Sequence, residues 1–300
     1  MFGGATLGNS PPFDTNEHLM QVYPILVTNG VKKVDSSQLY GQSESILGAT
    51  KAGDHVTLDT KWMGGPGWAT RDNIVKSAKS SIEKLCVNQV DVFYIHLPDP
   101  ETPISETLAA VQEVHQLGLF KRFGLSNYQA EDVENIYKHC KEHDYVPPTV
   151  YQGNYSAVSR KSETTLFPML QRLGIAFYAS SPLAGGFLTK MPQQIFDGAG
   201  RFNDTTYGGL YKQWFVKPAF LKALEQWDSI AKEEGCSHAD LAYRWVAYHS
   251  ALGKGDGLII GANNIERLKQ TLTGLGNGKL SSAAVKAIDT IWESVEHEAP

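Results

Sequence analysis

The strongest constraint on the fold is an alternation of strand-like and helix-like segments along almost the whole chain. Short runs rich in β-branched and aromatic residues alternate with segments whose apolar residues recur at helical spacing. Such alternation predicts a parallel sheet, because each helix returns the chain to the same end of the sheet. The predicted strands lie at 1–7, 31–36, 54–61, 90–97, 120–126, 149–153, 174–180 and 258–261.

Eight units of this kind predict an α/β fold, the closed (β/α)8 TIM barrel, in a single domain over residues 1–300. A long loop at 182–216 interrupts the pattern after strand seven, and an extra helix at 281–296 ends the chain. An open doubly wound sheet is the alternative, but no strand is followed by its G-x-G-x-x-G turn. The other predicted helices lie at 14–29, 43–49, 70–85, 102–118, 130–143, 162–173, 218–234, 237–250 and 264–272.

Composition argues against several classes of protein. The net charge is −5 and basic residues are scattered, so nothing favours binding to nucleic acid. No apolar run reaches the roughly 20 residues of a membrane span, and a presequence is not expected because the first basic residue is Lys32. Three distant cysteines without a C-x-x-C pair argue against disulfides and zinc. We expect a soluble cytoplasmic protein without a metal, and the sequence leaves open whether it forms a homo-oligomer.

Four side chains that can do chemistry fall where predicted strands end. Asp35 and Tyr40 follow strand two, Lys61 ends strand three and His96 ends strand four. Taken singly, each has an ordinary explanation: a turn or helix cap, a packing residue, a solvated lysine and a core histidine. Because the carboxyl ends of barrel strands share one rim, where active sites lie, we expect the four to form one cluster.

Such a cluster suits the reduction of a carbonyl group. A tyrosine phenol has a pKa of about 10 and is a poor proton donor near neutral pH, but a nearby ammonium lowers that pKa. Asp35 would keep Lys61 charged, and His96 would donate a hydrogen bond to the carbonyl oxygen. Tyr40 would then protonate that oxygen as hydride reaches the carbon, and the hydride must come from a cofactor.

Together with these residues, several segments resemble the aldo-keto reductase family, most closely its branch of aflatoxin aldehyde reductases. The likeness extends in matching order over most of the chain. The resemblance implies a barrel, NADPH as the cofactor and a small-molecule carbonyl substrate, an aldehyde or ketone, with Tyr40 as the acid. The segments that carry it are Asp35…Tyr40-Gly-Gln-Ser-Glu44, Lys61, Tyr94-Ile-His-Leu-Pro-Asp99, Gly124-Leu-Ser-Asn127, Tyr151-Gln-Gly-Asn-Tyr155 and Ser181-Pro-Leu-Ala-Gly-Gly186.

The resemblance also implies how the cofactor NADP is bound. Ser126, Asn127 and Gln152 would hold the nicotinamide carboxamide. Arg267, near a predicted helix start, would contact the 2′-phosphate, which favours NADP over NAD. Ser180 stands where family members often have a tyrosine that stacks on the nicotinamide, so affinity is lower or another aromatic side chain substitutes. The cofactor contacts expected besides these are Ser180, Ser181, Leu183, Gly185, Asn263, Asn264 and Gln270.

Aromatic and apolar residues suggest the kind of substrate. Trp62, Met63 and Trp68 follow strand three and predict an apolar or aromatic carbonyl compound. The 182–216 segment is too long for an ordinary packing loop, and its aromatic residues would cover the cofactor, line the mouth or pack together. These are Phe187, Phe196, Phe202, Tyr207, Tyr211, Trp214 and Phe215.

Two other functions compete with catalysis by a reductase. One alternative is a nucleotide-binding regulatory subunit on the same barrel, similar to the potassium-channel β-subunits. Such a subunit would bind the cofactor with little or no turnover. The intact set of Asp35, Tyr40, Lys61 and His96 argues for catalysis without excluding that alternative. A metal-dependent barrel hydrolase is remote, because no strand ends in a His-x-His pair or in paired carboxylates.

Overall fold

The computed structural model describes residues 1–300, with the exception of the side chain of Tyr207. The described chain forms an eight-stranded sheet whose order follows the sequence from β1 to β8. The pairs from β1–β2 to β5–β6 are parallel, and helices alternate with the strands. The (β/α)8 barrel class is therefore confirmed. The strands are β1 (Phe2–Gly3), β2 (Lys33–Asp35), β3 (Thr57–Trp62), β4 (Val90–Ile95), β5 (Phe120–Ser126), β6 (Pro148–Asn154), β7 (Ala176–Ser180) and β8 (Gly257–Leu258).

Several helices are preceded by a residue whose side chain accepts a hydrogen bond from a backbone N–H group of the first turn. Thr15, Ser237 and Ser281 each accept from the residue three positions along, which satisfies a donor that the helix itself leaves without a partner. The helices are α1 (Asn16–Thr28), α2 (Ser43–Ala49), α3 (Arg71–Leu85), α4 (Ile104–Gln116), α5 (Ala130–Glu142), α6 (Ser162–Thr165), α7 (Phe167–Leu173), α8 (Pro192–Phe196), α9 (Leu210–Phe215), α10 (Pro218–Glu234), α11 (His238–Tyr248), α12 (Ile265–Gly276) and α13 (Ser282–Val295). The 3₁₀ helices are η1 (Ala52–Asp54), η2 (Ala184–Thr189), η3 (Gly200–Phe202), η4 (Thr206–Gly209) and η5 (Glu296–Glu298).

The chain divides into two compact units, each made of three segments. The first unit comprises residues 1–153, 169–178 and 261–269, and the second comprises 154–168, 179–260 and 270–300. The catalytic side chains predicted from the sequence all belong to the first unit.

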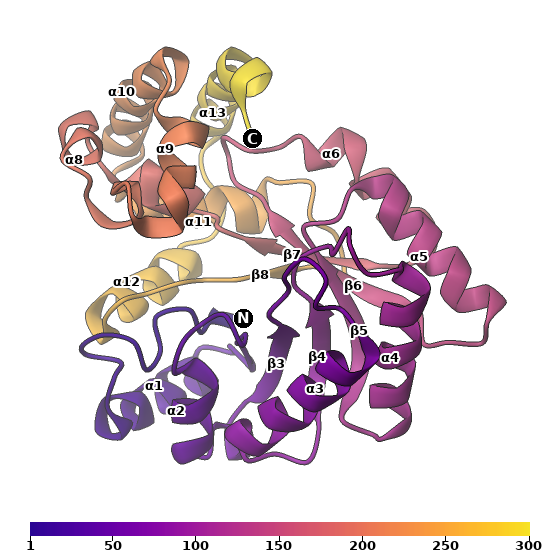
Figure 1. Cartoon of the computed structure of the whole chain (residues 1–300). Helices are drawn as coiled ribbons and strands as arrows, with labels where there is room; N and C mark the ends of the chain where they lie inside the picture. The colour runs from indigo at the N-terminus through magenta and orange to yellow at the C-terminus, as the bar shows by residue number, and fades with distance from the viewer. The chain divides into compact units, whose positions relative to one another are not determined.

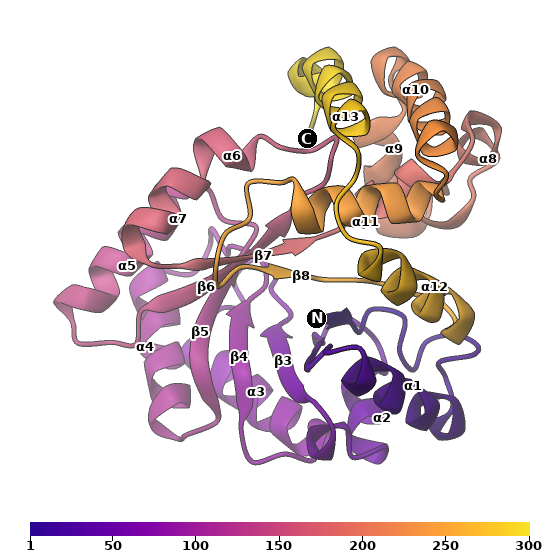
Figure 2. The same cartoon turned by 180° about the vertical axis from the view of Figure 1, so that it is seen from behind.

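In the first unit, β3, β4 and β5 run side by side, with α3 and α4 on one side of them (Figures 1 and 2). Side chains alternate along β3: Thr60 donates to Glu44 of α2 (2.6 Å), whereas Lys61 reaches Asp35 at the end of β2. On β5, a Cβ at Gly124 would lie 2.3 Å from the ring of Tyr94, so only glycine fits there. These close contacts fix the strand ends that carry the site.

In the second unit, α10 lies along α13 (Figures 1 and 2). Most of the described aromatic residues at 182–216 form a local core. Phe187, Phe202 and Phe215 are fully buried, and the rings of Phe187 and Phe215 stack with centroids 5.3 Å apart. Phe196 is exposed, and the side chain of Tyr207 lies outside the described residues. Packing therefore accounts for these three phenylalanines.

Some element boundaries differ from the predicted ones. The strand expected from 54 begins at Thr57, because residues 52–54 form η1. The helix expected at 162–173 is divided at Leu166 into two helices. Pro168, two residues further on, has no backbone N–H group and so cannot continue the hydrogen bonds of the first helix. The long connection after β7 holds α8, α9 and three short 3₁₀ helices, and the last strand is only Gly257–Leu258. No helix in the described part of the chain is long and apolar enough to cross a membrane.

Candidate active site

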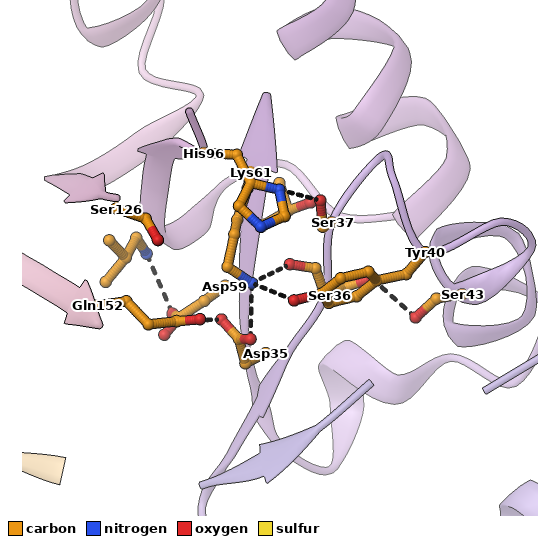
Figure 3. Close-up of polar contacts among 12 residues, drawn as sticks. Asp35, Ser36, Ser37, Tyr40, Ser43, Asp59, Lys61, His96, Ser126 and Gln152 are labelled. Carbon is orange, nitrogen blue, oxygen red and sulfur yellow. Dashed lines mark hydrogen bonds and ion pairs between the residues drawn. The ribbon is translucent and has the colours of Figure 1, made fainter. Parts of the chain in front are cut away.

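The ends of β2, β3 and β4 bring the predicted catalytic side chains together (Figure 3). Asp35 is the last residue of β2, Lys61 lies one residue before the end of β3, and His96 follows β4 directly. Tyr40 comes from the turn between β2 and α2, and Lys61 lies over its ring, with Nζ 4.8 Å from the ring centroid. The four residues therefore meet at one strand edge of the first unit, as their positions in the sequence predict.

Lys61 is completely buried and contacts three oxygen atoms. Its Nζ lies 2.6 Å from Oδ2 of Asp35, 2.8 Å from the backbone oxygen of Ser36 and 3.5 Å from the hydroxyl of Tyr40. Burial alone would lower the pKa of Lys61, but the charges and hydrogen bonds of Asp35 and Tyr40 together outweigh burial and the pKa is raised. Lys61 therefore keeps its positive charge beside the Tyr40 hydroxyl.

His96 meets the ring of Tyr40 edge-on, with ring centroids 5.8 Å apart. Its Nδ1 lies 3.0 Å from the hydroxyl of Ser37, and its Nε2 makes no hydrogen bond to any group that the structure describes. Burial, helped by the charge of Lys61, lowers the pKa of His96 to about 3. The imidazole is therefore neutral near pH 7, and Nε2 remains for an external partner.

Two of the residues expected at the nicotinamide carboxamide also contact the predicted catalytic residues Asp35 and His96. Gln152 Nε2 donates to Oδ1 of Asp35 (3.0 Å), whereas Lys61 donates to the other carboxylate oxygen, Oδ2 (Figure 3). Asn127 Nδ2 donates to the backbone oxygen of His96 (2.8 Å) and to Ser126 Oγ (3.1 Å). Asn127 has a left-handed backbone (φ 63°), and its Oδ1 accepts no hydrogen bond from the described chain. One amide oxygen therefore remains for a ligand.

The start of α12 gathers polar groups at the surface of the first unit. Asn264 precedes the helix, and its side-chain oxygen accepts from the backbone N–H of Arg267 (2.8 Å). The guanidinium of Arg267 donates to Oδ1 of Asn263 (3.0 Å), and the arginine is exposed. A cation beside the positive end of a helix dipole suits a phosphate group.

In the second unit, the segment after β7 has an unusual backbone. Ser181, Ala184, Gly185 and Gly186 all have positive φ. A Cβ at Gly185 would lie 2.1 Å from the ring of Tyr211, so a glycine is required there. Consecutive residues of this conformation form concave N–H arrays that suit anions. The cofactor contacts predicted for Ser180, Ser181, Leu183, Gly185 and Gln270 remain predictions.

The residues predicted to line the substrate pocket differ in exposure. Trp62 is 1% exposed, Met63 is half-buried, and Trp68 is 56% exposed. A Cβ at Gly64 would lie 3.1 Å from the side chain of Leu97, so the loops after β3 and β4 touch. Of the three, Trp68 is the one with most surface to offer a ligand.

Asp99 holds the loop that carries Trp68. Its Oδ1 accepts from the N–H of Gly67 (2.8 Å), and its Oδ2 accepts from the N–H of Ala69 (2.8 Å) and the hydroxyl of Thr102 (2.7 Å). Partial burial opposes ionisation, but these hydrogen bonds outweigh it and lower the pKa of Asp99. The carboxylate therefore stays ionised and keeps the loop in one conformation.

Comparison with known proteins shows the family of the chain. Residues 1–293 match the Aldo/keto reductase family. The chain belongs to that family. It is 38% identical to aflatoxin B1 aldehyde reductase member 2 of Rattus norvegicus, over 90% of this chain and 79% of the relative. It is 37% identical to aflatoxin B1 aldehyde reductase member 4 of Homo sapiens (90% and 87% covered) and 35% identical to the oxidoreductase sirO of Leptosphaeria maculans (100% and 95%).

Membership in the aldo/keto reductase family gives the chain a class of chemistry. It is an oxidoreductase that reduces carbonyl groups, and the predicted resemblance to aflatoxin aldehyde reductases is confirmed. In the described part of the chain, no group of three or more His, Cys, Asp or Glu side chains could hold a metal ion.

Sequence reasoning missed several residues of this aldo/keto reductase site. Ser36 accepts from Lys61 through its backbone oxygen, which no side-chain pattern could signal. Ser37 contacts His96, and Asp59 lies beside Asp35 in the strand register. Asp59 lies two residues before Lys61, so the alternation along β3 places both side chains on the same face, and Ser37 lies in the turn after β2. A search for further polar residues near the strand ends could therefore have found both.

Proposed function

We propose that this aldo/keto reductase uses NADPH to reduce an apolar or aromatic aldehyde or ketone to the alcohol, with Tyr40 as the proton donor. The observation that carries the proposal is the fully buried ammonium of Lys61, 3.5 Å from the Tyr40 hydroxyl and 2.6 Å from Asp35. A preorganised charge in a dry site stabilises the phenolate that remains after Tyr40 gives up its proton. Asp35 compensates the charge of Lys61 and holds it in place.

The four side chains divide the work. His96 is neutral and edge-on to Tyr40, so it can hold a carbonyl oxygen by a hydrogen bond beside the phenol. Tyr40 gives its proton to that oxygen, and being only partly buried it can take a replacement proton from water. A nicotinamide cofactor, when bound, would supply the hydride. Gln152 and Asn127 fix the positions of Asp35 and His96 through the hydrogen bonds described above.

The polar groups of the first unit fit a phosphorylated nicotinamide cofactor. The free Oδ1 of Asn127 can accept a carboxamide N–H at the edge where His96 lies. Arg267, exposed near the start of α12 and steadied by Asn263, can form the paired hydrogen bonds that a phosphate monoester accepts. Asn264 contributes by capping the helix. These groups support NADP rather than NAD.

Exposed apolar side chains near the catalytic residues support an apolar substrate. Trp68 is 56% exposed and Leu97 is 39% exposed, on the loops that follow β3 and β4. Leu97 is the residue after His96, and the two loops touch at Gly64. Apolar surface of this kind beside a few polar groups is typical of small-molecule sites.

Replacing Tyr40 by phenylalanine tests the assigned proton donor. We expect the Tyr40→Phe variant to bind NADPH as the wild type does, because the ring remains, and to lose at least about a hundredfold in turnover. Turnover is followed by NADPH absorbance with a panel of aromatic aldehydes, and binding by NADPH fluorescence. Unchanged turnover would reject Tyr40 as the acid. A wild type that binds NADPH and reduces none of the aldehydes would favour the regulatory role instead.

Replacing Arg267 by alanine tests the preference for NADP. We expect Arg267→Ala to weaken NADPH binding by about tenfold or more while NADH binding changes little, because only NADPH carries the 2′-phosphate. Lys269→Ala is the matched control, since Lys269 is an exposed cation on the same helix. Equal weakening of both cofactors in the arginine variant would show that Arg267 does not read that phosphate.

A further inference from the structure

The hydroxyl of Ser37 lies between a backbone amide and the catalytic histidine. Ser37 is fully buried in the turn after β2. Its Oγ lies 3.1 Å from the backbone nitrogen of Leu39 and 3.0 Å from Nδ1 of His96 (Figure 3). Within the described chain, no other group makes a hydrogen bond to this oxygen.

The position of one hydrogen follows from these two contacts. The N–H of Leu39 can only donate, so Ser37 Oγ accepts from it. If Nδ1 of His96 also donated to Oγ, the hydroxyl hydrogen of Ser37 would be buried without an acceptor. Leaving a buried hydroxyl hydrogen without an acceptor is unfavourable, because the group has lost its hydrogen bonds to water and gained none in the protein. If instead Ser37 donates to Nδ1, all the groups are satisfied, so this arrangement is the stable one.

The consequence reaches the second ring nitrogen. A neutral imidazole carries one hydrogen, and the low pKa of His96 (about 3) keeps the ring neutral near pH 7. With Nδ1 accepting from Ser37, that hydrogen is on Nε2, the nitrogen without a partner in the described chain. The opposite tautomer would present a lone pair at Nε2, which repels a carbonyl oxygen instead of holding it.

We propose that Ser37 is a positioning residue, which orients His96 and holds it in the tautomer with hydrogen on Nε2. The proposal rests on the proposed function, because the tautomer matters only if His96 holds a carbonyl oxygen beside Tyr40. Ser37 does not touch the reacting atoms itself. It acts through the imidazole, as second partners of catalytic histidines do.

Ser37→Val and Ser37→Thr form a matched pair, since the two side chains have nearly the same shape and differ in the hydroxyl. We expect the valine variant to lose about tenfold or more in kcat for aldehyde reduction, with NADPH affinity unchanged, and the threonine variant to recover most of the loss. Ser37→Ala, which adds no bulk to the buried site, serves as a second removal of the hydroxyl. Equal kcat in the valine and threonine variants, with alanine matching the wild type, would overturn the proposal.

Nitrogen-15 NMR of the imidazole reads the tautomer without any turnover. The His96 signals are assigned by their loss in a His96→Gln variant. We expect the wild type and Ser37→Thr to carry the hydrogen on Nε2, and Ser37→Val to show a mixture or the opposite tautomer. Hydrogen on Nδ1 in the wild type would overturn the proposal. Because this readout needs no substrate, it decides the tautomer even if the protein proves to reduce no carbonyl compound.

Discussion

At the scale of single residues, two of the predicted catalytic side chains are each contacted by a neighbouring polar side chain, Asp35 by Gln152 and His96 by Ser37. Asp35, Lys61 and His96 could be grouped because each ends a strand, and strand ends share a rim. The contacts of Gln152 with Asp35 and of Ser37 with His96 depend on folded side-chain positions that bring the two atoms of each pair to 3.0 Å. Spacing along a chain carries no such information, so these partners had to come from the structure.

The carboxyl group of Asp59, the neighbour of Asp35 in the strand register, makes the free energy of unfolding depend on pH. Asp59 is fully buried, and its Oδ1 accepts from the N–H of Val92 (3.1 Å), while its Oδ2 has no partner in the described chain. Burial raises the pKa of Asp59 to about 7; the nearby Lys33 opposes the rise, and the carboxylates of Asp35 and Asp91 add to it. Between about pH 4 and pH 7 the folded protein therefore holds a proton that the unfolded chain has lost. Stability from this group is fully present below that range and is lost as pH rises through it.

Asp59→Asn tests this account, because asparagine keeps an acceptor for the N–H of Val92 and cannot ionise. We expect the variant to gain about 1–3 kcal/mol in the free energy of unfolding, relative to wild type, on going from pH 5 to pH 8. Urea unfolding at several pH values measures the gain. Asp72→Asn, at a carboxylate that is 94% exposed, is the control and should show no such trend. A constant difference between Asp59→Asn and wild type across this range would contradict the assigned titration.

At the scale of elements, strong periodic patterns were predicted well and short or irregular elements were not. The strands β4 and β5 and the helix α3 agree with prediction because apolar spacing and end signals coincide there. The helical turns within 182–216 carry no sustained period, and many of their glycines adopt positive φ. Such turns are set by tertiary packing around buried rings such as Phe187, which a single sequence does not reveal.

At the scale of the whole molecule, the order of segments decides how the two units can unfold. Each unit is made of three segments, so the chain passes from one unit to the other repeatedly instead of once. One of these passages, between Tyr178 and Ala179, falls inside β7. A unit built this way is not a contiguous stretch of chain, and cutting the sequence at one linker would not release it. The prediction of a single domain over residues 1–300 therefore takes a testable form.

We expect both units to unfold in one cooperative transition. If one unit unfolded alone, β7 would be incomplete, and the three chain segments that make up the remaining unit would no longer have fixed ends. Native-state hydrogen exchange at increasing urea measures this directly. The backbone amides of β4 in the first unit and of α11 in the second should approach the same free energy of opening, equal to that of global unfolding. Amides of the terminal η5 serve as an internal control for local fraying and should exchange at lower free energy. Exchange of α11 through an opening that leaves β4 protected would show instead that the second unit unfolds by itself, and the barrel would then behave as two domains.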